Sequence, residues 1–376
     1  MKIKHIFICT LLSLVTTSLA GSCDDDKDDV TIVRDYSEQD NVDVPHKALP
    51  DFAYGADPSW VTAMEAADWK FYDTDGQATD CFELLSNTVG VNACRLRVWV
   101  NPSNGWCNTN DVVKKAQRAQ SAGQNIMIDF HYSDEWADPS KQKKPSIWDD
   151  CQSLDEMTDL LYKYTKKVLT ALKTNGVDVS WVQIGNETQN GMLETNSDGA
   201  ATSVSGWMGP DYCKLHNAGA KACKEVYPEC LIVVHFQNGQ NEAKNINSLE
   251  KLKAGGAEYD VFGVSLYPDF TKDTWYEDYI DACMHTLSTV KTTYGKDVMI
   301  CEVGCTDITT ENARIALNDV VYRCQHEVDA KGVFFWEPEC YNSWEGYKMG
   351  GFLSNGRPSD ALIGAFGGRA TSRLHD

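Results

Sequence analysis

Short apolar runs alternate with longer amphipathic stretches along most of the chain, from about residue 51 onward. The short runs occupy residues 52–56, 93–98, 125–130, 180–185, 231–236, 261–266, 298–301 and 332–335. Several are almost continuous in Val, Ile and Leu, as expected of parallel strands covered on both faces. The pattern therefore predicts eight buried β-strands.

The stretches between these runs have helical spacing. Residues 154–172 are the clearest, because apolar side chains recur there at steps of three and four residues. Residues 111–122, 212–227, 276–294 and 312–329 follow the same pattern. Eight strand–helix units predict an α/β fold, a single (β/α)8 TIM barrel over residues 51–376. An open doubly wound sheet is the alternative, but no GxGxxG or Walker motif is present.

The amino terminus is typical of an export signal. Lys2 and Lys4 precede an apolar run over residues 6–15, which is too short to span a membrane. Small residues then lead to Cys23, as at the lipid-modification site of bacterial lipoproteins, although Leu19 lies one position further from the cysteine than usual. We expect a lipoprotein signal over residues 1–22 with a lipid anchor on Cys23. The alternative is ordinary cleavage near Ala20.

Residues 23–50 are polar and acidic and have no apolar period, so they predict a flexible tether. The acidic run at residues 24–29 resembles the outer-surface export tag of some bacterial lipoproteins. We therefore expect an exported protein on the outer membrane, facing outward, which touches the membrane through its lipid alone. This location would suit a partner in glycan uptake, but no sequence marker identifies one.

Composition excludes several classes of protein. With 42% hydrophobic and 24% charged residues, the chain is neither disordered, collagenous nor a coiled coil. Its 55 acidic and 34 basic side chains give a net charge of −21, which argues against nucleic-acid binding. The 14 cysteines include no CxxC pair, so no zinc site is indicated. Disulfides and free buried thiols both remain open.

Polar and aromatic side chains gather where the predicted strands end, which is where barrels carry their chemistry. The candidates are Arg97, His131, Asp134, Trp136, Asn186, Glu187, His235, Tyr267, Glu302 and Trp336. Glu187 and Glu302 end the fourth and seventh runs, which face each other across a barrel mouth. Two such carboxyl groups, one protonated and one ionised, are the minimal machinery of glycoside hydrolysis. For either Glu alone, the alternative is a salt bridge or a helix cap.

The other candidates have two interpretations each. His131 and His235 resemble the ligands of zinc-dependent barrel hydrolases, but the first run lacks the HxH pair of those enzymes. Hydrogen bonds to hydroxyl groups or to the carboxylates are the preferred interpretation. Arg97 would orient and ionise a nearby Glu, or form a structural ion pair below the mouth. Trp136 and Trp336 would stack on sugar rings, or pack in the core.

Five motifs carry a family resemblance. They are GADPS at residues 55–59, RLRVWVNP at 95–102, DFHYSDEWADP at 129–139, QIGNE at 183–187 and FWEP at 335–338. With them, residues 52–366 resemble the endo-β-1,4-galactanases (arabinogalactan endo-β-1,4-galactanases) of glycoside hydrolase family 53. The third motif is long and specific, and favours galactan over other glycans.

The resemblance implies a retaining hydrolase with Glu187 as acid/base and Glu302 as nucleophile. It implies that Asn186 binds the sugar 2-hydroxyl, that Arg97, His131 and Asp134 surround this subsite, and that Tyr267 and Trp336 frame it. The two carboxyl groups should lie about 5–5.5 Å apart, and the pKa of Glu187 should be raised. Relatives with calcium carry an Asp- and Asn-rich insertion after the seventh strand, which is too short here, so we expect neither metal nor cofactor.

Endo-hydrolysis of β-1,4-galactan, a neutral glycan, is therefore the predicted function. A related endo-hydrolase acting on another β-linked glycan, such as mannan or xylan, is one alternative. A surface glycan-binding protein without catalysis is another, and the presence of both Glu residues argues against it.

Overall fold

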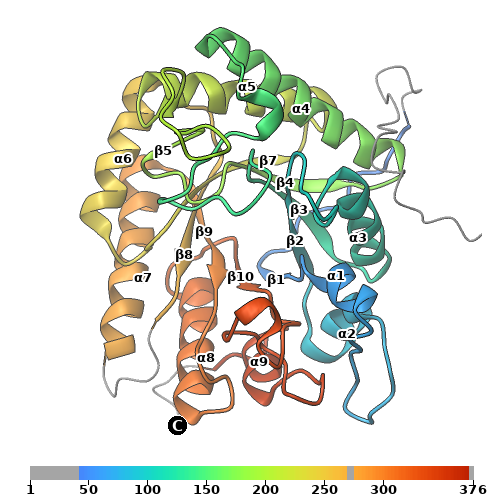
Figure 1. The fold of residues 1–376 in the computed structure, drawn as a ribbon. Coiled ribbons are helices and arrows are strands. Elements are labelled where there is room, and N and C mark those ends of the chain that lie inside the picture. Colours follow the sequence, from blue (N-terminus) through green and yellow to red (C-terminus); the bar gives the residue numbers. More distant parts are fainter. Residues whose placement is uncertain (1–41, 269–274, 372–376) are drawn as a thin grey trace, which may run out of the picture. The chain divides into compact units, whose positions relative to one another are not determined.

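The computed structural model describes residues 42–268 and 275–371, in which eight parallel strands close into a barrel. Figure 1 shows the strands at the centre with helices around them. The strands are β1 (Ala53–Asp57), β2 (Ala93–Val98), β3 (Asn125–Phe130), β4 (Val179–Ile184), β7 (Leu231–Phe236), β8 (Val261–Leu266), β9 (Asp297–Val303) and β10 (Gly332–Trp336). Pairing of β1 with β10 completes the ring. The predicted (β/α)8 barrel is confirmed.

The helices lie on the outside of the barrel (Figure 1). They are α1 (Val61–Ala66), α2 (Cys81–Leu84), α3 (Thr109–Ser121), α4 (Leu154–Thr174), α5 (Pro210–Val226), α6 (Glu242–Gly255), α7 (Trp275–Tyr294), α8 (Glu311–His326) and α9 (Asp360–Ala365). Polar caps set several of their first residues: Asn108, Ser153 and Thr310 each accept a hydrogen bond from a backbone N–H of the first turn. Apolar spacing alone does not reveal such caps.

The sequence analysis did not predict α6 or the hairpin of β5 (Gly191–Met192) and β6 (Gly206–Trp207). Helix α6 buries only two apolar side chains, Leu249 and Leu252, so its apolar periodicity is weak. The hairpin strands are two residues long, and this is too short for an alternating pattern. Both elements follow a barrel strand on the side of the mouth, and both matter for the site below.

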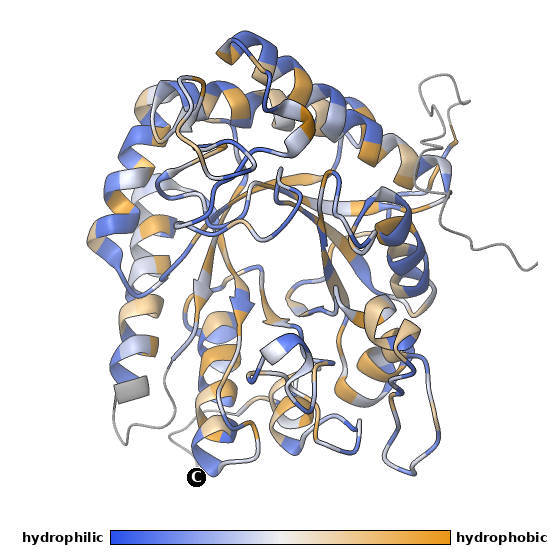
Figure 2. Cartoon of the chain, in the orientation of Figure 1, coloured by the Kyte–Doolittle hydropathy of each residue, from blue (hydrophilic) through white to orange (hydrophobic). Residues whose placement is uncertain are grey.

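Two apolar layers hold the barrel together. Nine buried side chains fill its interior, with Trp181 and Phe334 the largest. Gly55 lies against this filling, and a Cβ there would come within 2.2 Å of the Phe334 ring. A second layer lies between strands and helices. In Figure 2 the strands carry mostly hydrophobic colours, whereas the helices alternate between hydrophobic and hydrophilic faces.

Residues just before β1 contact the amino-terminal end of the barrel. The Lys47 backbone N–H donates to Asp178 Oδ2 over 2.7 Å, and Asn125 Nδ2 donates to the carbonyl oxygen of Ala48 over 3.2 Å. Leu49 packs against the interior layer. These contacts differ from the flexible tether expected over residues 23–50. The rest of that tether up to residue 41, the export signal and Cys23 lie outside the described residues.

All twelve cysteines among the described residues are buried, and none of them forms a disulfide. Within residues 42–268 and 275–371, no helix combines the length and the apolar character that crossing a bilayer requires.

Candidate active site

Arg95 lies at the centre of the barrel mouth. It comes from β2, is fully buried, and forms ion pairs with three carboxylates from three other strands. Its Nη1 lies 2.6 Å from Asp57 Oδ2, and its Nη2 lies 2.9 Å from both Asp129 Oδ2 and Glu302 Oε1. A buried cation is stable only where such partners replace its lost hydration. Arg95 therefore fixes Glu302 relative to the barrel wall.

Two amide side chains complete the shell around Arg95. Gln183 Oε1 accepts from Arg95 Nε over 3.0 Å, while Gln183 Nε2 donates to Asp129 Oδ1 over 2.6 Å. Asn186 Oδ1 accepts from Arg95 Nη2 over 2.9 Å, and Asn186 Nδ2 donates to the Ala137 carbonyl oxygen over 2.8 Å. These bonds hold Asn186, directly before Glu187, in one orientation.

Glu302 is the second-to-last residue of β9, and two partners bind its carboxylate. Besides Arg95 on Oε1, the Tyr267 hydroxyl donates to Oε2 over 2.8 Å. Burial is the largest effect and raises the pKa of Glu302 above its ordinary value, whereas the Arg95 charge and the Tyr267 hydrogen bond oppose this rise. Glu302 thus has a cation and a hydroxyl donor as partners for its anionic carboxylate.

Glu187 follows β4 and has no such cation in contact with it. Its Oε1 accepts a hydrogen bond from Ser265 Oγ over 2.7 Å, and the side chain is almost fully buried. Burial and, second, the negative charge of nearby Glu302 together raise the pKa of Glu187 to about 8, against the lowering effect of the Ser265 hydrogen bond. At neutral pH Glu187 therefore holds the proton of the pair, and Glu302 is the anion.

The backbone at Glu187 is strained. Its φ is +50°, a left-handed conformation that side chains other than Gly adopt at a cost of about 1–3 kcal/mol. The Thr188 N–H donates to the His235 carbonyl oxygen over 2.8 Å, which holds the turn to β7. Gly185, with φ of +82°, begins this turn. Such a strained position, enforced by neighbouring strands, is typical of functional sites.

The two candidate histidines are buried and bind protein groups. His235 Nε2 lies 3.0 Å from Ser265 Oγ, and its Nδ1 lies 2.9 Å from Asn186 Oδ1. His131 Nε2 lies 3.0 Å from Asp129 Oδ2. Burial lowers the pKa of His235 well below its usual value, so this ring is neutral. Both rings position the groups around the two Glu residues.

Arg97 does not contact either candidate Glu. It forms an ion pair with Glu337, and its guanidinium carbon lies 4.3 Å from the ring centroid of Trp136. Trp60 and Trp99 flank it at 5.0 and 5.1 Å. This contact is a buried ion pair, the second of the two interpretations of Arg97, and the role of Arg97 at the sugar subsite stays a prediction. The ion pair with the candidate Glu302 belongs to Arg95, two residues earlier on the same strand.

Asp134 holds two loops together. Its Oδ1 accepts from the Asn101 N–H over 2.9 Å, and its Oδ2 accepts from the Ser146 N–H and hydroxyl over 2.8 and 2.7 Å. These contacts join the segments that follow β2 and β3. The structure therefore brings Asp134 to the rim as a loop anchor.

A cleft lined by aromatic side chains opens among the segments that follow β10, β1, β2 and β3. It has a volume of about 680 Å³, and its aromatic lining consists of Trp60, Trp99, Trp106, Trp136, Trp344 and Tyr347. Trp336 packs between this cleft and Glu302, with ring centroids 5.6 Å from Trp136 and 6.5 Å from Tyr267. Candidates Trp136, Trp336 and Tyr267 thus form one continuous aromatic wall.

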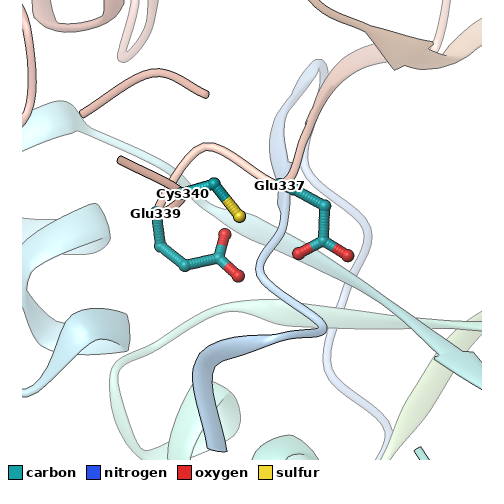
Figure 3. A group of neighbouring side chains, drawn as sticks. All are labelled: Glu337, Glu339 and Cys340. Carbon is teal, nitrogen blue, oxygen red and sulfur yellow. The ribbon is translucent and has the colours of Figure 1, made fainter. Parts of the chain in front are cut away.

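Glu337, Glu339 and Cys340 form a buried acidic cluster after β10. Figure 3 shows the three side chains gathered around one point. Their ligand atoms lie within 4.8 Å of one another, and this is the one such group among the described residues that could hold a metal ion. Burial and the charge of Glu337 raise the pKa of Glu339 well above its usual value. Since Arg97 already balances Glu337, a proton on Glu339 leaves the cluster neutral without a metal.

The sequence analysis did not include Arg95, Asp129, Gln183 or Ser265 among the candidates. Each is a polar residue inside a strand that is otherwise apolar, and each is buried. Polar residues at such positions cost free energy unless they are paired, so they indicate a network inside the barrel mouth. The sequence already contained this signal, because each of the four polar residues lies inside a different predicted strand.

Comparisons with known proteins show the family of the chain. The family model of glycosyl hydrolase family 53 matches residues 53–361. A Bacillus subtilis (strain 168) protein named endo-β-1,4-galactanase is 33% identical over 320 residues, covering 77% of this chain and 70% of its own. A Neosartorya fischeri protein named probable arabinogalactan endo-β-1,4-galactanase A is 35% identical over 259 residues, covering 66% and 68%.

Solved structures agree. A structure of fungal β-1,4-galactanases has a TM-score of 0.71 at 26% identity, covering 82% of this chain and 97% of its own. The family 53 catalytic domain of Ignisphaera aggregans has a TM-score of 0.70 at 27% identity, covering 86% and 98%. The barrel and its pair of buried carboxyl groups thus define a glycoside hydrolase. The chain belongs to glycosyl hydrolase family 53.

The protonation of Glu339 can be tested with two matched variants. Glu339→Gln replaces a neutral acid with a neutral amide, so the free energy of unfolding should change by about 1 kcal/mol or less. Glu337→Gln leaves Arg97 buried without its counter-charge and should cost about 3–5 kcal/mol. Urea denaturation measures both. Equal large losses would indicate that Glu339 is ionised, as a bound cation would require.

Proposed function

We propose that this protein is an endo-β-1,4-galactanase that cleaves galactan by double displacement. The observation that carries the proposal is the contrast between the two carboxyl groups. Arg95 and Tyr267 stabilise the charge of Glu302, while burial and that charge keep a proton on Glu187. A nucleophile and a general acid require these opposite states. The galactan substrate is inferred from the names of the relatives.

In the first step Glu302 attacks the anomeric carbon of the sugar. A new C–O bond forms to its carboxylate as the glycosidic C–O bond breaks. Glu187 gives its proton to the departing oxygen, so the remaining chain leaves as a neutral hydroxyl. We expect Asn186, directly before Glu187, to bind the sugar 2-hydroxyl, whose hydrogen would be donated to Asn186 Oδ1 alongside the hydrogen bond from Arg95.

In the second step the roles follow from electrostatics. Once Glu302 is an ester, its negative charge is gone, and one of the causes that raise the pKa of Glu187 disappears. The pKa of Glu187 therefore falls, and its ionised form becomes more stable. It takes a proton from water as the water oxygen attacks the anomeric carbon, and the Glu302 carboxylate is released with Arg95 ready to stabilise it.

Activity on purified glycans tests the substrate and the nucleophile together. Reducing ends should be released from β-1,4-galactan but not from mannan or xylan. Glu302→Gln should abolish this release while the protein stays folded at the assay temperature, because Asp57 and Asp129 still balance the charge of Arg95. Release from mannan or xylan instead would reassign the substrate. If galactan bound equally to the wild type and to Glu302→Gln but was cut by neither, the protein would bind the glycan without cleaving it.

The pH dependence of kcat/KM tests the proton assignment. Glu187 must be protonated to act as an acid, so kcat/KM should fall as the pH rises through its pKa of about 8. In Ser265→Ala the carboxylate loses a hydrogen bond. Its pKa should rise, and the alkaline limb should move up by about half to one pH unit. An unmoved limb, or one that moves to lower pH, would contradict the assignment of Glu187.

We further propose that the signal over residues 1–22 exports the protein and that Cys23 anchors it by lipid to the outer surface. The apolar run, the small residues before Cys23 and the acidic run after it support this proposal. Radiolabelled palmitate should label the wild type in cells, whereas Cys23→Ala should be unlabelled and released from membranes. A labelled Cys23→Ala variant, or an unlabelled wild type, would contradict it.

A further inference from the structure

One tryptophan at the mouth is unusually exposed. Trp207 lies on β6 with 56% of its surface accessible, whereas all other described Trp side chains are buried or partly buried. Exposing a large aromatic ring to water costs free energy that a binding partner would recover. The hairpin that carries Trp207 follows β4, so it belongs to the same segment as Glu187.

The ring stands at a groove of about 310 Å³, which we call the β6 groove. It lies between the segment after β4 and helix α6, and its lining includes Gln189, Asn190, Trp207, Lys244, Asn247 and Lys251. Gln189 is 2% exposed, and its Nε2 has no hydrogen-bond partner within residues 42–268 and 275–371. Its Oε1 accepts from the Gln237 N–H over 2.8 Å, which fixes the amide. A buried donor without a partner at the groove indicates a missing acceptor.

Trp207 is held in place by its backbone. It pairs with Gly191 in the hairpin, and the Met208 N–H donates to the Asn190 carbonyl oxygen over 2.8 Å. A Cβ at Gly191 would lie 2.8 Å from the Trp207 Cα, so the two strands approach closely. The backbone that carries the ring therefore needs little ordering when a ligand binds.

The groove and the aromatic cleft lie on opposite sides of the mouth. The cleft is lined by segments that follow β10, β1, β2 and β3, whereas the groove is lined by segments that follow β4 and β7. Glu187 lies on the side of the groove, two residues before Gln189. A general acid faces the departing part of the substrate, so the groove lies where the leaving chain would run.

We propose that the β6 groove binds a galactose unit of the leaving chain, beyond the bond that is cut. Trp207 stacks against the C–H face of the pyranose ring, and Gln189 Nε2 donates to one of its hydroxyl oxygens. Amide groups and an aromatic face suit a neutral sugar. This inference rests on the proposed galactanase function and adds to it a subsite that favours long substrates.

The test compares two substrates in one variant. One is β-1,4-galactan, and the other is an aryl β-1,4-galactobioside, whose leaving group is a single ring too short for the groove. In Trp207→Ala the ratio of kcat/KM for galactan to kcat/KM for the aryl substrate should fall about tenfold. Trp207→Phe keeps a stacking face and should restore most of the ratio.

The control is Ile147→Ala, which removes another exposed apolar side chain, 63% accessible, from a different loop. Its ratio should match the wild type. An unchanged ratio in Trp207→Ala, with galactan still cleaved, would overturn the subsite alone, and so would an equal loss on both substrates. A wild type that does not cleave galactan would overturn the proposed function together with the subsite.

Discussion

The ion pairs of Arg95 are the interaction on which the rest of the site depends. One fully buried guanidinium reaches Asp57 on β1, Asp129 on β3 and Glu302 on β9, and so joins strands from opposite sides of the barrel. Desolvating a cation is costly, and only this set of partners makes it possible. Arg95 fixes Glu302 close to Glu187. Burial first, and the negative charge of Glu302 second, raise the pKa of the Glu187 carboxyl group, so Glu187 is the group that holds the proton.

In the proposed mechanism, two chemically identical side chains take different roles because their surroundings differ. Glu302 has Arg95 and Tyr267 as partners, whereas Glu187 has a serine hydroxyl and little solvent. The states are coupled, because the charge on Glu302 helps to keep the proton on Glu187. Under that proposal, forming the glycosyl ester removes this charge, so the first chemical step prepares Glu187 to act as a base in the second.

Much of the barrel and of the candidate site could be predicted from the sequence. The other features could not be predicted, for physical reasons. Parallel strands of a barrel are buried on both faces, so β2, β3, β7 and β8 stand out as apolar runs with their observed bounds. Glu187 and Glu302 end such runs. Arg95 and Arg97 lie two residues apart and face the same side of β2, and apolar spacing does not tell which of them meets Glu302. Only the register of the neighbouring strands decides that Arg97 meets Glu337.

The exposure of Trp207 is equally invisible in the sequence. It depends on where a hairpin of two-residue strands lies, and on a helix, α6, whose apolar face is narrow. The packing of Leu49 against the interior layer of the barrel has the same origin, since long-range contacts determine it. The sequence motifs contain the candidate residues, whereas the positions of the hairpin and of α6 become known only from the structure.

The most direct test of the central claim is to trap the covalent intermediate. A 2-deoxy-2-fluoro galactobioside with a good leaving group slows the second step, so the ester should accumulate on the nucleophile. Mass spectrometry of the intact protein should then show one added glycosyl group, and peptide mapping should place it on Glu302, with no addition in Glu302→Gln. A label on Glu187, or no label together with an inverted anomeric product by NMR, would contradict the account.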